Sequence, residues 1–121
     1  MPKILLVDDE EAVLKSITML LKAEGHEVVA HKDPSKAAEL IKTDNFDLLI
    51  TDIRMTPIDG IELIKLAHAK TPDLPVIIIS AYSSEKTEKQ GYNAGCVSYL
   101  RKPFKISDVI EALHKVFNPK S

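Results

Sequence analysis

The chain has 121 residues, one cysteine and a net charge of −2, from 16 lysines and arginines against 18 aspartates and glutamates. This length fits a single domain over residues 1–121, one cysteine excludes a disulfide scaffold, and the lack of a secretory signal favours the cytoplasm. The longest apolar runs fall far short of the roughly 20 residues that cross a bilayer, and the near-neutral charge offers no basic surface for nucleic acid, so this chain alone is expected to bind neither.

Short apolar runs alternate with longer amphipathic stretches along the whole sequence. The runs predict five strands, at residues 3–7, 28–30, 47–51, 75–79 and 97–100. The first, third and fourth are apolar at successive positions, which is typical of parallel strands covered on both faces. This alternation predicts an α/β fold, a (βα)5 doubly wound five-stranded parallel sheet. Right-handed crossovers favour the flavodoxin-like strand order 2-1-3-4-5.

Helices are expected between and after the strands. The first spans about residues 9–24, the second is capped by Asp33 and begins at Pro34, and the third follows Asp59. The fifth carries an apolar stripe on one face, which consists of Ile106, Val109, Ile110, Leu113, Val116 and Phe117.

The fourth helix, between Ser84 and Gly95, differs from the others. Its residues are mostly charged or small, and Gly91 lies in its interior. Glycine weakens a helix, and a helix without apolar residues gains little from packing on a sheet. We therefore expect this helix to be held less firmly than its neighbours and to be the element that moves.

Polar residues follow the predicted strands where the strands end. Asp8 and Asp9 follow the first, Asp52 the third, Ser80 the fourth and Lys102 the fifth. In a doubly wound sheet the binding crevice lies beyond these carboxyl ends. Three carboxylates at close range oppose one another's ionisation, which favours a shared proton or a bound divalent cation. Ligands that are all oxygen indicate Mg²⁺.

A lysine and a hydroxyl beside such a metal form a cradle for an anion, which suggests phosphoryl chemistry. Asp52 would be the nucleophile and form an aspartyl phosphate. Asp8 and Asp9 would hold the metal, and Lys102 would pair with the transferred phosphoryl group. The hydroxyl of Ser80 would donate a hydrogen bond to one of its oxygens.

Five short motifs occur at these strand ends. They are Val-Asp-Asp at 7–9, Asp-Ile-Arg-Met at 52–55, Asp-Gly at 59–60, Ser-Ala-Tyr at 80–82 and Tyr-Leu-Arg-Lys-Pro-Phe at 99–104. As an ordered set that covers nearly the whole chain, they resemble the receiver domain of bacterial two-component response regulators. The family includes chemotaxis regulators with the 2-1-3-4-5 order, so the resemblance implies this order as well.

The resemblance also implies a function, a phosphorylation-dependent signalling switch. Asp52 would accept a phosphoryl group from a sensor histidine kinase or a histidine phosphotransfer protein, and the backbone carbonyl of Arg54 would join the Mg²⁺ shell. Ser80 and Tyr99 would form a switch pair that remodels the face made by the fourth helix, fifth strand and fifth helix, and so regulates a partner or effector domain. The chain would catalyse only its own phosphorylation and dephosphorylation, so it would not be an enzyme. The Lys102-Pro103 bond is commonly cis in such proteins.

Two features depart from the family's usual pattern. Proline most often stands four residues after the phosphoacceptor, where this chain has Thr56, and the proline follows as Pro57. Cys96 replaces a usual alanine, and the segment 85–93 lacks an alanine-rich apolar face. We therefore expect the loop after the third strand and the output face to differ in geometry.

Other functions are weighed against this one. A Mg²⁺-dependent phosphohydrolase would usually have a second aspartate two residues after the nucleophile, where Arg54 stands. A flavin-binding module would be repelled by the acidic first loop. A degenerate receiver that acts as an interaction module is disfavoured because every phosphorylation residue is present.

Single residues also have purely structural interpretations. Asp9 fits a helix start, Ser80 a turn, and Tyr99 a half-buried strand position. Cys96 is expected to be a small buried hydrophobic residue without a redox role. The four histidines show no metal spacing and are expected at the surface: His26, His31, His68 and His114.

Overall fold

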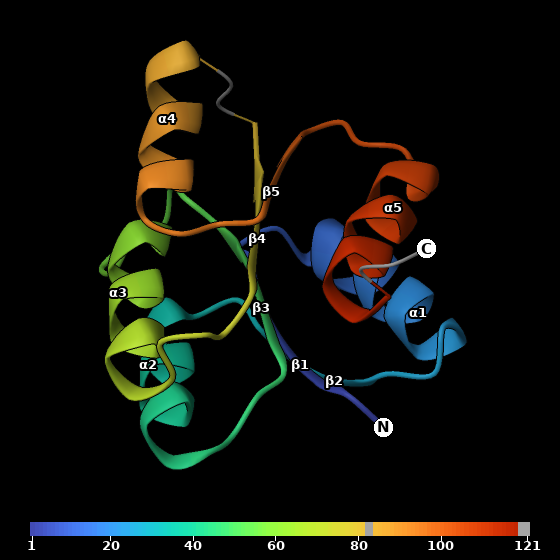
Figure 1. The fold of residues 1–121 in the computed structure, drawn as a ribbon, viewed down its shortest axis with the longest axis horizontal. Helices are drawn as coiled ribbons and strands as arrows, with labels where there is room; N and C mark the ends of the chain where they lie inside the picture. The colour runs from blue at the N-terminus through green and yellow to red at the C-terminus, as the bar shows by residue number, and fades with distance from the viewer. Residues whose placement is uncertain (82–83, 119–121) are drawn as a thin grey trace.

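A computed structural model describes residues 1–81 and 84–118. Five strands alternate with five helices among these residues (Figure 1). The strands are β1 (Lys3–Val7), β2 (Glu27–His31), β3 (Leu48–Asp52), β4 (Val76–Ser80) and β5 (Ser98–Arg101). The helices are α1 (Glu11–Ala23), α2 (Pro34–Thr43), α3 (Gly60–Lys70), α4 (Glu85–Asn93) and α5 (Ile106–Phe117). The predicted (βα)5 pattern is confirmed, and each strand lies within one residue of its predicted bounds.

The five strands form one parallel sheet in the order β2-β1-β3-β4-β5, which confirms the flavodoxin-like prediction. β1, β3 and β4 are buried on both faces, as their continuous apolar sequences predict. The carboxyl ends of β1 and β3 are neighbours, with Val7 paired to Thr51. The polar residues that follow these two strands therefore meet at one edge of the sheet.

Helices cover both faces of the sheet. α1 and α5 lie on one face, and α2, α3 and α4 lie on the other (Figure 1). Side chains of a strand alternate between the two layers: Leu5 and Val7 of β1 join the core under α2 and α3, whereas Ile4 and Leu6 join the core under α1 and α5. Among the described residues, no helix is both long enough and apolar enough to span a membrane.

Side-chain caps mark where α2 and α3 begin, and the cap at Asp33 confirms the prediction. Asp33 accepts a hydrogen bond from the N–H of Ser35 at 2.9 Å, ahead of Pro34 at the first position of α2. Asp59 accepts a hydrogen bond from the N–H of Glu62 at 2.9 Å, at the start of α3.

α1 begins at Glu11, two residues later than expected. The carboxylate of Asp8 accepts the N–H of Glu10 at 2.9 Å, and Glu10 has an extended backbone. Asp9 and Glu10 therefore belong to the loop after β1, which affects where their side chains point.

The predicted apolar stripe of α5 is confirmed in the centre of the helix, but the prediction is wrong for its first residue. Val109 and Leu113 are buried, and Phe117 packs against the same core. Ile110 is half-buried. Ile106 is 66% exposed, because it is the first residue of the helix and the packed stripe begins only at Val109.

The structure corrects the expectation that the histidines lie at the surface. His114 is exposed, but His26, His31 and His68 are half-buried. The ring of His26 stacks on Phe117 with 5.0 Å between centroids. Nε2 of His68 lies in hydrogen-bond contact with the carbonyl oxygen of Leu74 at 2.9 Å. These neighbours explain why His26 and His68 are drawn inward.

Candidate functional site

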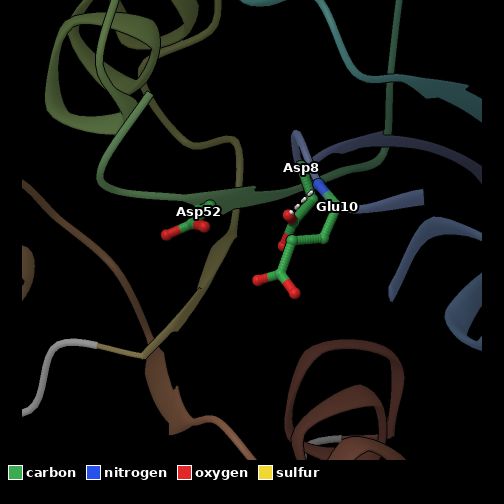
Figure 2. Close-up of side chains that lie close together, drawn as sticks. All are labelled: Asp8, Glu10 and Asp52. Carbon is green, nitrogen blue, oxygen red and sulfur yellow. Dashed lines mark hydrogen bonds between the residues drawn. The ribbon is translucent and has the colours of Figure 1, made fainter. Parts of the chain in front are cut away.

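Three carboxylates meet at the carboxyl edge of the sheet. Asp8, directly after β1, is fully buried, and Asp52, the last residue of β3, is 6% exposed. Glu10 lies in the loop after β1, and an oxygen of each of the three residues lies within 4.8 Å of the others. Figure 2 shows Asp8 and Glu10 side by side, with Asp52 on the neighbouring strand β3. The predicted convergence of three carboxylates is confirmed for Asp8 and Asp52 and wrong for Asp9, since Glu10 is the third member of the cluster.

Lys102 brings one positive charge to this acidic cluster. Its Nζ lies 2.8 Å from Asp8 Oδ2, 2.8 Å from Glu10 Oε1 and 3.1 Å from Asp52 Oδ2. Its side chain is only 10% exposed, so water screens these contacts little. One ammonium faces three carboxylates, which leaves the cluster with an excess of negative charge.

The protonation of the cluster reflects this balance. Burial raises the pKa of Asp8, and nearby Asp52 raises it further, whereas Lys102 and the N–H of Glu10 lower it. Burial alone lowers the pKa of Lys102, but its contacts with the three carboxylates outweigh burial and hold the pKa well above its usual value. Lys102 is therefore a permanent cation in the site.

Backbone groups orient the Asp52 carboxylate. Its Oδ1 accepts hydrogen bonds from the N–H of Ile53 at 2.7 Å and the N–H of Arg54 at 3.4 Å. Its Oδ2 faces Lys102. The two oxygens thus have different partners, and Oδ2 is the one directed at the acidic cluster.

Gly60 sets how closely α3 approaches the end of β3. A Cβ at this position would lie 2.1 Å from the carbonyl oxygen of Asp52, so no other residue fits without backbone movement. The N–H of Gly60 donates to the carbonyl of Ile53 at 2.8 Å. The glycine of the Asp-Gly motif therefore holds the helix start against the strand that carries Asp52.

Ser80 and Tyr99 lie together beside the acidic cluster. Ser80 ends β4, the neighbour of β3, and is fully buried. Tyr99 of β5 is 9% exposed. Burial raises the pKa of the Tyr99 phenol, and a hydrogen bond with Ser80 partly offsets the rise. The predicted pair is in contact, and its role in switching stays a prediction. Tyr82 of the Ser-Ala-Tyr motif lies outside the described residues.

Asp9 lies apart from the three clustered carboxylates. It is exposed and lines a neighbouring cavity of about 840 Å³ together with Arg54 and Thr56. Its predicted contact with a metal stays a prediction. Glu10, in contrast, was interpreted as part of the first helical turn, and the structure adds it to the cluster. The hydrogen bond from the N–H of Glu10 to Asp8 keeps Glu10 in the loop, and this contact is visible only in the structure.

The chain's two departures from the family pattern have structural outcomes. The displaced proline follows a cis Thr56-Pro57 bond. The Lys102-Pro103 bond is also cis, as the resemblance implied. Cys96 is buried, as predicted, and burial raises the pKa of its thiol to about 11.

The residues of the acidic cluster suit a hard divalent cation. All three offer carboxylate oxygens, which Mg²⁺ prefers. Oδ2 of Asp8 is fully buried, and its close contact is the Lys102 ammonium at 2.8 Å. This single ammonium is shared by three carboxylates, so the site is short of positive charge. A Mg²⁺ ion would meet this need and reduce the excess negative charge.

Comparisons with known proteins agree with this site. The family model described as response regulator receiver domain matches residues 4–114. The response regulator MprA of Mycolicibacterium vanbaalenii is 32% identical over 108 residues, which are 89% of this chain and 47% of that protein. The transcriptional regulatory protein ZraR of Escherichia coli K12 is 34% identical over 112 residues, which are 93% of this chain and 25% of that protein. The chain thus spans about half the length of MprA and a quarter of ZraR.

Solved structures give the same family. A CheY-like receiver domain protein from Methanospirillum hungatei JF-1 has a TM-score of 0.88 and 30% identity, with 95% of this chain and 92% of that chain covered. The response regulator TrrA from Thermotoga maritima, solved in complex with Mg²⁺ and BeF, has a TM-score of 0.85 and 29% identity, with 96% of this chain and 99% of that chain covered. This chain therefore belongs to the response regulator receiver domain family, the signalling domains of two-component systems.

Proposed function

We propose that this chain is a phosphorylation-dependent switch that accepts a phosphoryl group on Asp52. The donor is a phosphohistidine on a sensor histidine kinase or a histidine phosphotransfer protein. The observation that supports this most strongly is the position of Asp52 Oδ2, 3.1 Å from the Lys102 ammonium and beside buried Asp8. A carboxylate in this setting can attack phosphorus while neighbouring charges offset the charge that develops.

In the proposed transfer, Oδ2 of Asp52 attacks the phosphorus atom of the phosphohistidine. The phosphorus–nitrogen bond breaks, and the imidazole nitrogen leaves with the bonding electron pair and takes up a proton. Lys102 pairs with the phosphoryl oxygens once they are attached to Asp52, and the Ser80 hydroxyl donates a hydrogen bond to one of them. Later attack by water returns Asp52 and releases phosphate.

The proposed metal is Mg²⁺. Asp8, Asp9, Asp52 and the backbone carbonyl of Arg54 would hold it, and the position of Glu10 makes its carboxylate a further ligand. The ion supplies charge neutralisation for the phosphoryl oxygens during transfer. The three clustered carboxylates, which share the one ammonium of Lys102, support this assignment.

We propose that the output is a change in the face formed by α4, β5 and α5. Tyr99 on β5 contacts Ser80, so a movement of the Ser80 hydroxyl reaches this face directly. The regulated element in this proposal is an effector domain or a separate protein, and the switch works in the cytoplasm. An effector domain is consistent with the matched relatives, which are about two to four times longer than the matched segment. In this proposal the chain by itself binds no nucleic acid. It acts as a switch, and its only catalysis is its own phosphorylation and dephosphorylation.

The test is the intact mass of the chain after incubation with Mg²⁺ and acetyl phosphate. The unmodified chain is expected to gain one phosphoryl group, and Asp52→Asn none. Asp73→Asn is a matched control, because Asp73 is an exposed aspartate in the loop after α3. Equal phosphorylation of Asp52→Asn would contradict the proposal. Absence of phosphorylation in every variant would favour the interaction-module alternative.

A further inference from the structure

α4 lies on the sheet without an apolar side chain of its own in the core. Its two buried residues are Thr87 and Gly91. Its one aromatic residue, Tyr92, is 51% exposed. The other helices each bury at least one aliphatic or alanine side chain. The hydrophobic contact that normally holds a helix on a sheet must therefore come from the sheet side.

The ring of Tyr99 supplies that contact. Tyr99 belongs to the buried core on the α3 and α4 side of the sheet, together with Ile78. The side chain of Tyr99 lies under Gly91, since a Cβ at Gly91 would be 3.1 Å from Cδ2 and 3.3 Å from Cε2 of the ring. The same Cβ would be 2.8 Å from Cδ1 of Ile78. An alanine at this position would therefore collide with the end of Ile78 and press tightly on the Tyr99 ring.

The remaining contacts of α4 are polar and partly solvated. Ser84 caps the helix by accepting the N–H of Thr87 at 3.0 Å. Arg101 of β5 pairs with Glu88, with 3.0 Å between Nε and Oε2, but the arginine side chain is 62% exposed. Such surface ion pairs contribute little to stability. Neither contact replaces the apolar burial that α4 lacks.

We propose that Gly91 is a positioning residue that seats the inward ring of Tyr99, and that this ring holds α4 against the sheet. Gly91 leaves the space that the ring fills, and the ring, together with the end of Ile78, provides the large apolar surface beneath Gly91. When the ring leaves this seat, α4 loses its anchor. The extension of this idea to signalling, in which the position of Ser80 and the seating of Tyr99 are coupled, rests on the proposed function above.

Hydrogen exchange of the unphosphorylated chain without Mg²⁺ tests the anchor. Tyr99→Ala is expected to raise the exchange rates of the α4 amides at least tenfold and to leave the amides of β1 and β3 unchanged. Tyr92→Ala is the matched control, because it removes an exposed tyrosine from α4 itself, and it is expected to change those rates less than twofold. Equal protection of α4 in Tyr99→Ala and in the unmodified chain would overturn the proposal.

Two sets of Gly91→Ala measurements test the seat. In the chain with Tyr99, the added methyl group is expected to raise α4 exchange, because it collides with the end of Ile78 and the ring leaves neither of them room to move. In the Tyr99→Ala background the same change is expected to lower α4 exchange, because the end of Ile78 can turn into the space that the ring left and alanine favours a helix more than glycine does. The same sign of effect in both backgrounds would overturn the role of Gly91.

A second readout remains decisive if Tyr99→Ala fails to fold. Tetranitromethane nitrates accessible tyrosine rings, and peptide mapping gives the rate at each tyrosine. Gly91→Ala is expected to raise nitration of Tyr99 at least tenfold and to leave exposed Tyr92 unchanged. An unchanged rate at Tyr99 would overturn the proposal. Because no phosphorylation is involved, failure here leaves the chemistry of Asp52 untouched, and failure of phosphorylation leaves this result intact.

Discussion

The ammonium nitrogen of Lys102 lies 3.1 Å from Oδ2 of Asp52, although 50 positions separate the two residues in the chain. Asp52 ends β3, and Lys102 follows β5, so β4 lies between their strands in the sheet. Oδ1 of Asp52 is already bound by the N–H of Ile53. The lysine therefore contacts the oxygen that is directed into the acidic cluster. The charge balance between this lysine and the carboxylates is what the substitutions of Lys102 and Asp8 test.

Lys102→Ala is expected to destabilise the metal-free chain at pH 7 by roughly 1–3 kcal/mol, because it removes the cation from charge-assisted contacts with three carboxylates. Mg²⁺ should restore more stability to this variant than to the unmodified chain, since the excess negative charge is larger. Urea unfolding with and without Mg²⁺ measures both effects. Lys15→Ala, at an exposed position of α1, is the matched control, and an equal loss in the two variants would contradict the account.

Asp8→Asn is expected to raise the free energy of unfolding at pH 7 without Mg²⁺. The substitution removes a fully buried charge that burial and Asp52 both oppose, while it keeps the shape of the side chain. The same change should weaken Mg²⁺ binding at least tenfold, so added Mg²⁺ no longer stabilises the variant. Thermal unfolding over a Mg²⁺ series measures this. An identical Mg²⁺-dependent rise in Tm for both chains would exclude Asp8 as a ligand.

Cys96 is expected to react slowly with thiol reagents in the folded chain. Its pKa is raised by burial to about 11, from 9.0 for a free thiol, so at pH 8 the thiolate is roughly 100-fold scarcer. Because the folded pKa is the higher one, this thiol favours folding below pH 9 and loses that contribution as the pH rises from 9 to 11. Labelling at pH 8, compared with the urea-unfolded chain, checks the rate. Equal rates would refute the buried placement.

Gly60→Ala is expected to destabilise the chain by roughly 1–3 kcal/mol, because its Cβ would collide with the carbonyl of Asp52 and force α3 away from β3. Phosphorylation from acetyl phosphate should slow as well, since the end of β3 shifts. Gly25→Ala is an informative comparison: Gly25 has a φ of +88° but no atom within 4 Å of an added Cβ. Chemical unfolding measures the stability of both variants, and phosphorylation by acetyl phosphate is expected to stay normal in Gly25→Ala and to slow in Gly60→Ala. Normal phosphorylation in both variants would contradict the role of Gly60.

Much of the fold could be predicted from local patterns. The continuous apolar runs of β1, β3 and β4 and the cap at Asp33 depend on neighbouring residues, and each was confirmed. The meeting of Asp8, Asp52 and Lys102 followed from topology, because parallel strands end at one edge of the sheet.

Other features depended on the three-dimensional path of the chain. Glu10 joins the carboxylate cluster because Asp8 holds its N–H in the loop, and a helix start predicted at residue 9 had concealed this. Ile106 fits the helical period but lies beyond the packed face. His26 is half-buried through its contact with the distant Phe117, and His68 through the carbonyl of Leu74 in the loop that follows its helix; neither contact is indicated by helical or strand periodicity. The weak packing of α4 was predicted, but the ring of Tyr99 beneath Gly91 appears only in the structure.

The most direct test of the central claim is to reduce the phosphorylated chain with sodium borohydride and to map its peptides. Borohydride converts an aspartyl phosphate to homoserine, so it marks the acceptor covalently. After incubation with Mg²⁺ and acetyl phosphate, the account predicts homoserine in place of Asp52 and nowhere else, with none in the Asp52→Asn variant. Homoserine in place of Asp8 or Asp9, or a phosphorylated chain without any homoserine, would contradict the assignment of Asp52 as the phosphoryl acceptor.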